Sequence, residues 1–300
     1  MSILQPTTKP VSVYRWDDED APALNGDRSS LLVLLKACLV TGYGGKEGLG
    51  WTMPFEDINQ GVKCFRADTS EGLPDFWLRA SNDTGAEATI SGYSAMSSLD
   101  EGQLSHELDS TYYYAMKNRT GRWMVIGNNR SFWLFVESGY LGGNKVGTWL
   151  FAGDTGTDSS GFSLQYLHFT GNPYRNWRDG APQSFVYMPD AGEGGVFPKA
   201  TRNYKAIALQ SKTALVPFAG NEGVATRYVS PVYVHTGDDY VLLPGVFTAT
   251  DSRSLTNYQA VQIQLDRQRE MIAHGSCGGY ARDRRYPLCT VLIATGWWDY

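Results

Sequence analysis

The sequence predicts an α+β fold made mostly of antiparallel β-strands, with one confident helix near the N-terminus. The 300 residues include 33 glycines, 18 tyrosines and 9 tryptophans. Many glycines combined with many aromatic side chains favour short strands joined by turns. Only one segment, at about residues 29–41, repeats its apolar side chains with the spacing of a helix. The length suffices for one large domain or two ordinary ones.

Charge and hydropathy argue against nucleic-acid binding and membrane insertion. The net charge is -5 and the pI is about 5.4, whereas nucleic-acid-binding domains are usually basic. No apolar window reaches the ~18 residues that a spanning helix needs, and residues 1–20 lack the apolar core of a signal peptide. Four cysteines are too few for a disulfide scaffold of this size. We therefore expect a soluble protein made in the cytoplasm.

Residues 1–26 are expected to form an extended N-terminal arm. Pro6, Pro10 and Pro22 disfavour a helix, and the four acidic residues 17–20 repel one another. The stretch VSVYRW between them alternates like a short strand. Two interpretations stay open: a solvated terminus, or an arm that docks on a neighbouring subunit.

The best specified segment runs from Asp27 to Trp51. Asp27, Ser29 or Ser30 can cap the helix, and Gly42 suits the left-handed position after its last turn. The glycine-rich stretch 42–46 follows a helix and lacks the GK[ST] ending, so it is a helix stop and not a phosphate cradle. One helix face collects the apolar residues of this segment, namely Leu31, Leu34, Leu35, Cys38 and Leu39.

From Gly61 onward the apolar pattern shortens to strand length. GRWMVIGNNRSFWLFVE predicts a hairpin with Asn128-Asn129 at its tip, where a positive φ is tolerated. Residues 171–203 are dense in Gly, Pro and Asn and predict a linker or a long surface excursion. The predicted organisation is therefore the arm 1–26, a strand-rich α+β domain over 27–170, this excursion, and a β-rich region over 204–300 that is either separate or part of the same domain.

The motif HGSCGGY, at residues 274–280, has the form of the nucleophile loop of chymotrypsin-like cysteine proteases. Its glycines would let backbone amides point at an oxyanion, with Cys277 as the nucleophile. Such an enzyme needs a histidine base, yet neither His168 nor His235 lies in a recognisable base motif. Only ~40 residues separate His235 from Cys277, which is short for a two-barrel protease. A glycine turn before the last strands is favoured, and the protease is a minor alternative.

Acidic residues and histidines form no recognisable metal or glycosidase motif. The acidic run 17–20 and the Asp154/Asp158 loop lack the spacing of a calcium loop, and no cysteine pair has C-x-x-C spacing. Strand-rich acidic chains commonly offer carboxylate pairs of the glycosidase kind, so we predict no catalytic, cofactor-binding or metal-binding residues. The carboxylates considered beside aromatic residues are Glu71, Asp75, Glu137 and Asp154.

Aromatic clusters punctuate the predicted strands. We interpret most of them as cross-strand core packing, while some have the character of subunit-interface anchors. The clusters are Tyr112–Tyr114, Trp123, Phe132-Trp133, Trp149 and Trp297-Trp298.

Three segments together resemble a family of virion structural proteins from tailed bacteriophages: VYRWDDEDAPAL, LLKACLVTGYGGKEGLGWTMPF and SGYSAMSSLDEG. In that family an extended segment with Asp-x-x-Ala-Pro precedes a helix that ends in Leu-Val-x-Gly-Tyr-Gly and continues to Gly-Trp. A strand-rich region with Gly-Tyr-x-x-Met follows. Most of the match lies in the first hundred residues. The matching residues are Ala21-Pro22, Leu39 to Gly44, Gly50-Trp51, Gly92, Tyr93 and Met96.

The resemblance implies a non-enzymatic subunit of a phage particle, located in the virion after synthesis in the host cytoplasm. Its implied partners are copies of itself and other virion proteins of the capsid, neck or tail. Head decoration, neck or collar, and tail or baseplate all stay open. The alternative is a virion-associated protein that binds or cleaves carbohydrate receptors. Exposed Trp and Tyr on a groove with flanking carboxylates would support that alternative, and a buried aromatic set would support the structural role.

Overall fold

The structure is a computed structural model that describes residues 8–70, 74–106, 111–113, 121–141, 144–157, 163–169, 205–207, 216–218, 227–235, 240–249, 258–264, 268–276 and 290–300. Within them one α-helix, α1 (Ser30–Lys36), continues into the π-helical turn η1 (Ala37–Thr41). The other elements are β-strands, and all their pairings are antiparallel. The predicted strand-rich α+β fold is therefore confirmed. No helix in the described part is long and apolar enough to cross a membrane.

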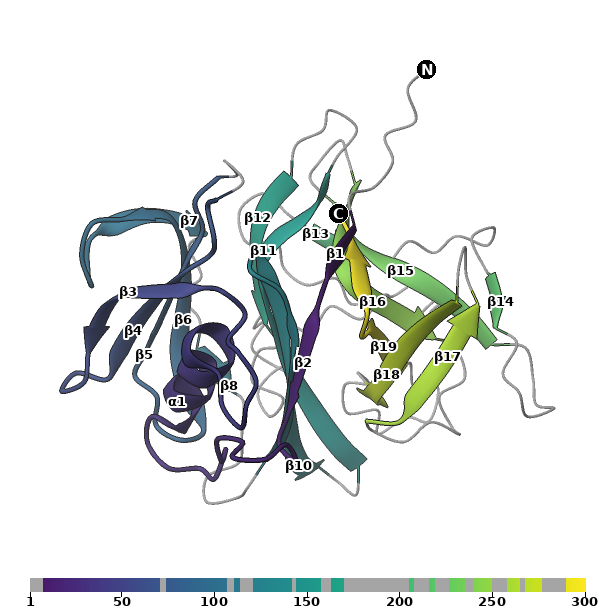
Figure 1. Cartoon of the computed structure of the whole chain (residues 1–300), viewed down its shortest axis with the longest axis horizontal. Helices are drawn as coiled ribbons and strands as arrows, with labels where there is room; N and C mark the ends of the chain where they lie inside the picture. The colour runs from purple at the N-terminus through teal and green to yellow at the C-terminus, as the bar shows by residue number, and fades with distance from the viewer. Residues whose placement is uncertain are drawn as a thin grey trace.

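Three large sheets form successive layers, with the central sheet between the other two (Figure 1). A separate two-stranded ribbon pairs β1 (Thr8–Pro10) with β20 (Trp297–Asp299). The central sheet has the order β12 (Ser163–Phe169), β11 (Asn144–Thr157), β10 (Ser131–Leu141), β9 (Arg122–Gly127), β2 (Ser12–Arg15). The N-terminal sheet has the order β3 (Thr52–Asp57), β4 (Val62–Arg66), β5 (Trp77–Ser81), β6 (Glu87–Met96), β7 (Gly102–His106), with β8 (Thr111–Tyr113) also paired to β6. The C-terminal sheet has the order β13 (Lys205–Ile207), β15 (Arg227–His235), β16 (Tyr240–Ala249), β19 (Thr290–Ala294), β18 (Gln268–Ser276), β17 (Ala260–Gln264), with β14 (Val216–Phe218) paired to β15.

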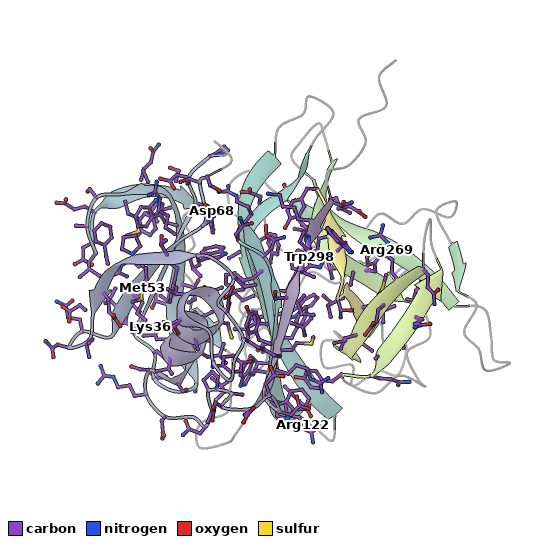
Figure 2. The ribbon with its side chains drawn as sticks, in the orientation of Figure 1. Lys36, Met53, Asp68, Arg122, Arg269 and Trp298 are labelled. Carbon is purple, nitrogen blue, oxygen red and sulfur yellow. The ribbon has the colours of Figure 1, made fainter. Side chains whose placement is uncertain are left out.

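Both faces of the central sheet are buried at β9 and at residues 131–136 of β10. Because successive strand residues point to opposite faces, β9 and β10 supply two cores at once. Core 1 lies toward α1 and the N-terminal sheet, and includes Trp123, Val125, Phe132, Leu134 and Val136. Core 2 lies toward the C-terminal sheet, and includes Met124, Ile126, Trp133, Phe135 and Trp149. Trp298 lies on the core 2 side, whereas Lys36 and Met53 lie on the helix side (Figure 2). Cross-strand core packing is thus confirmed for the described aromatic residues of β9, β10 and β11.

Trp133 of the central sheet and Trp298 of the two-stranded ribbon both contact β16 of the C-terminal sheet at Pro244–Gly245. The indole N–H of Trp133 donates to the Pro244 carbonyl at 2.9 Å. A Cβ on Gly245, which has φ 72°, would lie 2.0 Å from Nε1 of Trp298. Only glycine therefore allows Trp298 to approach the strand so closely.

The N-terminal segment is extended, but residues 8–24 lie within the fold of their own chain. β2 pairs with β9 and β1 pairs with β20. Tyr14 and Leu24 are buried in core 1, and the indole N–H of Trp123 donates to the Pro22 carbonyl at 2.9 Å. Residues 8–24 are therefore extended, as expected, and pair with strands of their own chain, while docking on a neighbouring subunit stays a prediction. Residues 1–7 and the excursion 171–203 lie outside the described residues.

The predicted helix is confirmed over 30–41, but none of the predicted caps is used. Ser29 has φ 67°, and its side chain makes no cap hydrogen bond. Instead a carboxylate oxygen of Asp83 accepts the backbone N–H groups of Leu31 at 2.9 Å and Leu32 at 3.2 Å. A residue 52 positions downstream of Leu31 therefore caps the helix and ties it to the N-terminal sheet.

The predicted hairpin around Asn128-Asn129 is confirmed as β9–β10. Neither asparagine uses the positive φ that it would tolerate. The Asn128 side chain closes the turn by accepting the backbone N–H groups of Arg130 at 2.9 Å and Ser131 at 3.1 Å. An asparagine that bonds to the backbone two residues on makes a left-handed conformation unnecessary.

Candidate functional site

The two N-terminal segments that carry the family resemblance contact each other. The Asp18 carboxylate lies 2.6 Å from the ammonium of Lys46 and accepts the Tyr43 hydroxyl at 2.8 Å. It also accepts the backbone N–H of Arg15 at 2.7 Å. We call Asp18, Tyr43, Gly44 and Lys46 the clasp, because they join the acidic run after β2 to the glycine-rich turn after η1.

The electrostatics of the clasp hold Asp18 ionised and Tyr43 neutral. Partial burial would raise the pKa of Asp18, but hydrogen bonds from Lys46, the Arg15 backbone and Tyr43 bring it below its usual value. Burial, and then the nearby Cys38 and Asp18, raise the pKa of Tyr43 far above its usual value. Burial likewise raises the pKa of the Cys38 thiol, so this cysteine lacks the low pKa of a reactive thiolate.

Three backbone donors of the glycine turn are used within the chain itself. The N–H of Gly42 donates to Ala37 at 2.8 Å, and Tyr43 and Lys46 exchange backbone hydrogen bonds at 3.0 and 2.8 Å. Gly44 has φ 52°, and a Cβ there would lie 2.0 Å from the Glu19 carbonyl oxygen. The turn is therefore built for close packing on the acidic run, in agreement with its interpretation as a helix stop.

The clasp also covers the outer edge of β2. The Lys46 ammonium donates to the Val13 carbonyl at 3.0 Å, and the Tyr43 hydroxyl donates to the Arg15 carbonyl at 3.4 Å. The Tyr14 hydroxyl donates to the Glu47 carbonyl. Side chains that satisfy edge carbonyls in this way prevent the addition of a further strand.

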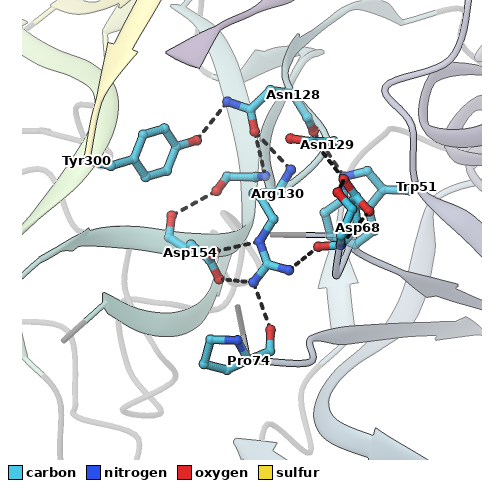
Figure 3. Close-up of polar contacts among 10 residues, drawn as sticks. Trp51, Asp68, Pro74, Asn128, Asn129, Arg130, Asp154 and Tyr300 are labelled. Atoms are coloured by element: carbon cyan, nitrogen blue, oxygen red, sulfur yellow. Dashed lines mark hydrogen bonds and ion pairs between the residues drawn. The ribbon is translucent and has the colours of Figure 1, made fainter. Parts of the chain in front are cut away.

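A second polar cluster is buried between the sheets (Figure 3). Arg130 forms a bidentate ion pair with Asp154, at 2.7 and 2.9 Å, and the two side chains are only 1% and 4% exposed. The same guanidinium donates to the carbonyls of Asp68 and of Pro74, the latter at 2.8 Å. We call this set, with Asn128 and Tyr300, the polar junction.

The polar junction joins segments from both ends of the chain. The side-chain amide of Asn128 donates to the Tyr300 hydroxyl at 2.9 Å, and the carbonyl of Asn128 accepts the indole N–H of Trp51 at 3.1 Å. Burial raises the pKa of Tyr300 although hydrogen bonds from Ser131 and Asn128 lower it. Every contact satisfies a buried polar group, which is what a structural network requires.

The carboxylates that the sequence offered for glycoside cleavage are engaged elsewhere or lie outside the described residues. Asp75 forms a bidentate ion pair with Arg66 at 2.7 and 2.8 Å, and Asp154 pairs with Arg130. Glu71 falls outside the described residues, as does Asp158 of the loop considered for calcium. Glu137 lies on β10, where its register partners are Arg122 of β9 and Gly147 of β11. The structure thus brings no described pair of these carboxylates together as a free acid and base.

The cysteine-protease motif also yields no assembled site in the described part. His274 and Ser276 belong to β18, where they pair with Val291 and Thr290 of β19. Cys277 lies outside the described residues, so its surroundings are not addressed. Within those residues, no group of three or more His, Cys, Asp or Glu side chains is arranged to hold a metal ion.

The third resemblance segment contributes Tyr93 and Met96 to a small apolar cluster on the outer face of the N-terminal sheet. Trp77 and Met96 are buried there with Val62 and Cys64, and Tyr93 packs against them. The ring of Phe55 stacks on Trp77 with centroids 5.6 Å apart and an interplanar angle of 12°. Tyr93 and Met96, like Tyr43 and Gly44, therefore serve packing in this structure.

Sequence reasoning missed the polar junction altogether. Arg130 follows two asparagines in a predicted turn, where an arginine is ordinarily exposed. Asp154 was considered only as a loop ligand or as a glycosidase carboxylate. No protein-family model, curated protein sequence or solved structure matches this chain.

Proposed function

We propose that this protein is a structural subunit of a tailed-bacteriophage virion, acting in assembly at the head surface, the neck or collar, or the tail. The observation that carries the proposal is that the two N-terminal resemblance segments are joined by the clasp, which includes the matching residues Tyr43 and Gly44. Tyr43 and Lys46 hold Asp18, Gly44 permits contact with Glu19, and Trp51 donates to the Asn128 carbonyl. The matching residues Tyr43, Gly44 and Trp51 thus have a structural role, and we propose no catalytic role for them.

The placement of the tryptophans also supports a structural role over a carbohydrate-directed one. Sugar-binding sites use exposed aromatic rings, whereas a scaffold buries them. In the described part, Trp297 is exposed and Trp16 is partly buried. The buried tryptophans are Trp51, Trp77, Trp123, Trp133, Trp149 and Trp298.

The proposal is tested by counting this chain in purified phage particles. Quantitative mass spectrometry against a labelled standard should find it at a fixed ratio to the major capsid protein. Hundreds of copies would assign it to the head surface, and about three to twelve would assign it to the neck or tail, as ring symmetries there require. Particles that lack the chain, from a host in which it is expressed, would overturn the proposal.

A further inference from the structure

The link between the N-terminal segment and α1 contains an asparagine followed by a glycine, Asn25-Gly26, a pair that occurs once in the sequence. Both residues lie outside helices and strands, and the Asn25 side chain is exposed. The backbone nitrogen after an asparagine can attack the side-chain amide carbon, because the two groups are joined closely enough to close a five-membered ring. Glycine favours this attack, since it has no side chain to obstruct the ring.

The backbone nitrogen that would attack is differently engaged at Asn25 and at a second exposed asparagine, Asn59. Within the described part of the chain, no hydrogen bond engages the backbone N–H of Gly26. After Asn59, in contrast, the backbone N–H of Gln60 donates to the Asp57 carboxylate at 3.0 Å. The Gln60 nitrogen must give up this charge-assisted bond before it can attack, whereas the Gly26 nitrogen has no such bond to break.

The side chain of Asn25 is held over the peptide that follows it. Its Oδ1 accepts the backbone N–H of Asp27 at 3.1 Å, and its Nδ2 donates to the Asp27 carboxylate at 2.6 Å. An asparagine bonded to the backbone two residues on folds its side chain over the intervening peptide, here that of Gly26. The N–H donor at Oδ1 also stabilises the negative charge that develops on this oxygen during attack at Cγ.

We propose that Asn25 is a self-modification site, which the Gly26 nitrogen converts to a carboxylate and whose products loosen the attachment of α1. The Gly26 nitrogen loses its proton and bonds to Cγ of Asn25. The Cγ–Nδ2 bond breaks, and the nitrogen leaves as ammonia with that proton. Water then opens the cyclic imide. Opening at Cγ gives aspartate, and opening at the main-chain carbonyl gives isoaspartate, in which the main chain runs through Cβ and Cγ.

Either product is poorly accommodated beside Asp27. The Nδ2 group that donates to the Asp27 carboxylate at 2.6 Å is replaced by oxygen. Two carboxylates then face each other where a hydrogen bond was made, and like charges at that spacing repel. Isoaspartate in addition inserts Cβ into the main chain and so lengthens the link.

The link is fixed on both sides, so a longer main chain has consequences for the helix. Leu24 is buried in core 1, and its carbonyl accepts the backbone N–H of Gly121 at 2.7 Å. The Gly26 carbonyl packs on Gly85, where a Cβ would lie 2.0 Å from it. The N–H of Gly85 donates to the carboxylate of Asp83 at 2.9 Å. Displacement of Gly26 therefore disturbs the residue that caps α1.

The first test is peptide mapping by mass spectrometry of the full-length folded protein, incubated at mildly alkaline pH. Fragment ions distinguish asparagine, aspartate and isoaspartate at each position. We expect deamidation at Asn25 to be at least about tenfold faster than at Asn59, since the Gln60 N–H must first leave a carboxylate. Asn59 is an internal control, because it is exposed and experiences the same solution. Equal rates at the two asparagines would overturn the proposal.

Hydrogen–deuterium exchange of the aged protein tests the effect on the helix. The backbone N–H groups of Leu31 and Leu32 report the cap, because both donate to Asp83. In aged protein their exchange should be roughly fivefold faster than in fresh protein, as expected for a weakened N-cap. Asn25→Gln, aged in parallel, keeps an amide but would have to close a larger ring, so its exchange should not change. Circular dichroism would establish that this variant is folded. Unchanged exchange in aged protein that carries isoaspartate would overturn the loosening of α1.

Discussion

The polar junction and the clasp each hold separate segments together through an acid–base pair, but they differ in burial. The side chains of Arg130 and Asp154 are 1% and 4% exposed, whereas those of Lys46 and Asp18 are 39% and 18% exposed. A buried charge that loses its partner stays desolvated, while a partly exposed one regains water. We therefore expect loss of the ion pair to destabilise the fold strongly at the polar junction and only modestly at the clasp.

The largest effect should follow from Arg130→Met. The substitution leaves Asp154 buried without its cation and removes the donor to two carbonyls, so the free energy of unfolding should fall by about 3–5 kcal/mol. Urea denaturation measures it. The double variant Arg130→Met/Asp154→Leu removes the orphaned charge and should recover part of the loss. If Arg130→Met lost no more stability than a clasp variant, burial would not explain a difference between the polar junction and the clasp.

Within the clasp, Gly44→Ala should be more harmful than Gly45→Ala. Both glycines have a positive φ, but only at Gly44 would a Cβ meet backbone, 2.0 Å from the Glu19 carbonyl oxygen; at Gly45 nothing lies within 4 Å. We expect losses of about 2–4 and about 1 kcal/mol respectively in thermal or urea unfolding. Equal losses of stability in the two variants would mean that residues 17–20 move away from the added Cβ at little cost.

Asp18→Asn should lower stability by about 1–2 kcal/mol at neutral pH, because it removes a charge-assisted contact. The pKa of Asp18 lies below its ordinary value of 3.8 in the folded chain. Its contribution is therefore complete above the unfolded value and is lost as pH falls through the folded value. The free energies of unfolding of the unsubstituted protein and of Asp18→Asn, measured with urea at a series of pH values, should become equal at acidic pH. A difference that persisted there would assign the effect to packing.

Tyr300→Phe should have the smallest effect, about 0.5–1.5 kcal/mol, since it removes the hydroxyl that accepts from Asn128 and leaves the ring in place. Differential scanning calorimetry would detect the shift. A loss as large as that of Arg130→Met would show that the junction depends on this rim contact as much as on its ion pair.

Local patterns predicted most of the elements but not how they meet. The helical spacing of Leu31, Leu34 and Leu35 identified α1, and the turn at Asn128-Asn129 identified the β9–β10 hairpin. The runs WMVI and FWLFV do not alternate between apolar and polar residues, because both faces of their strands are buried. The sequence pattern therefore could not predict which side chain lies in which core. β18 was missed, since its HGS end was interpreted as part of a glycine loop.

The two polar clusters were beyond prediction for the same reason. Asp83 caps a helix 52 residues upstream, Asp18 binds Lys46 across a helix, and Arg130 meets Asp154 across a strand pair. Each contact is made by tertiary packing, which spacing along the chain does not encode. The glycines of the clasp were recognised as a turn, but the segment against which they pack was not.

The pairing of β1 with β20 also determines when during synthesis β1 can form its strand pair. Thr8 pairs with Asp299, so β1 leaves the ribosome long before its partner strand β20 has been synthesised. At about 5–20 residues per second this wait is on the order of tens of seconds. The charges of residues 17–20 would keep the waiting segment hydrated and apart from other nascent chains. Ribosome-bound chains stopped before residue 290 should therefore be cleaved within β1 by protease, and released chains should be protected.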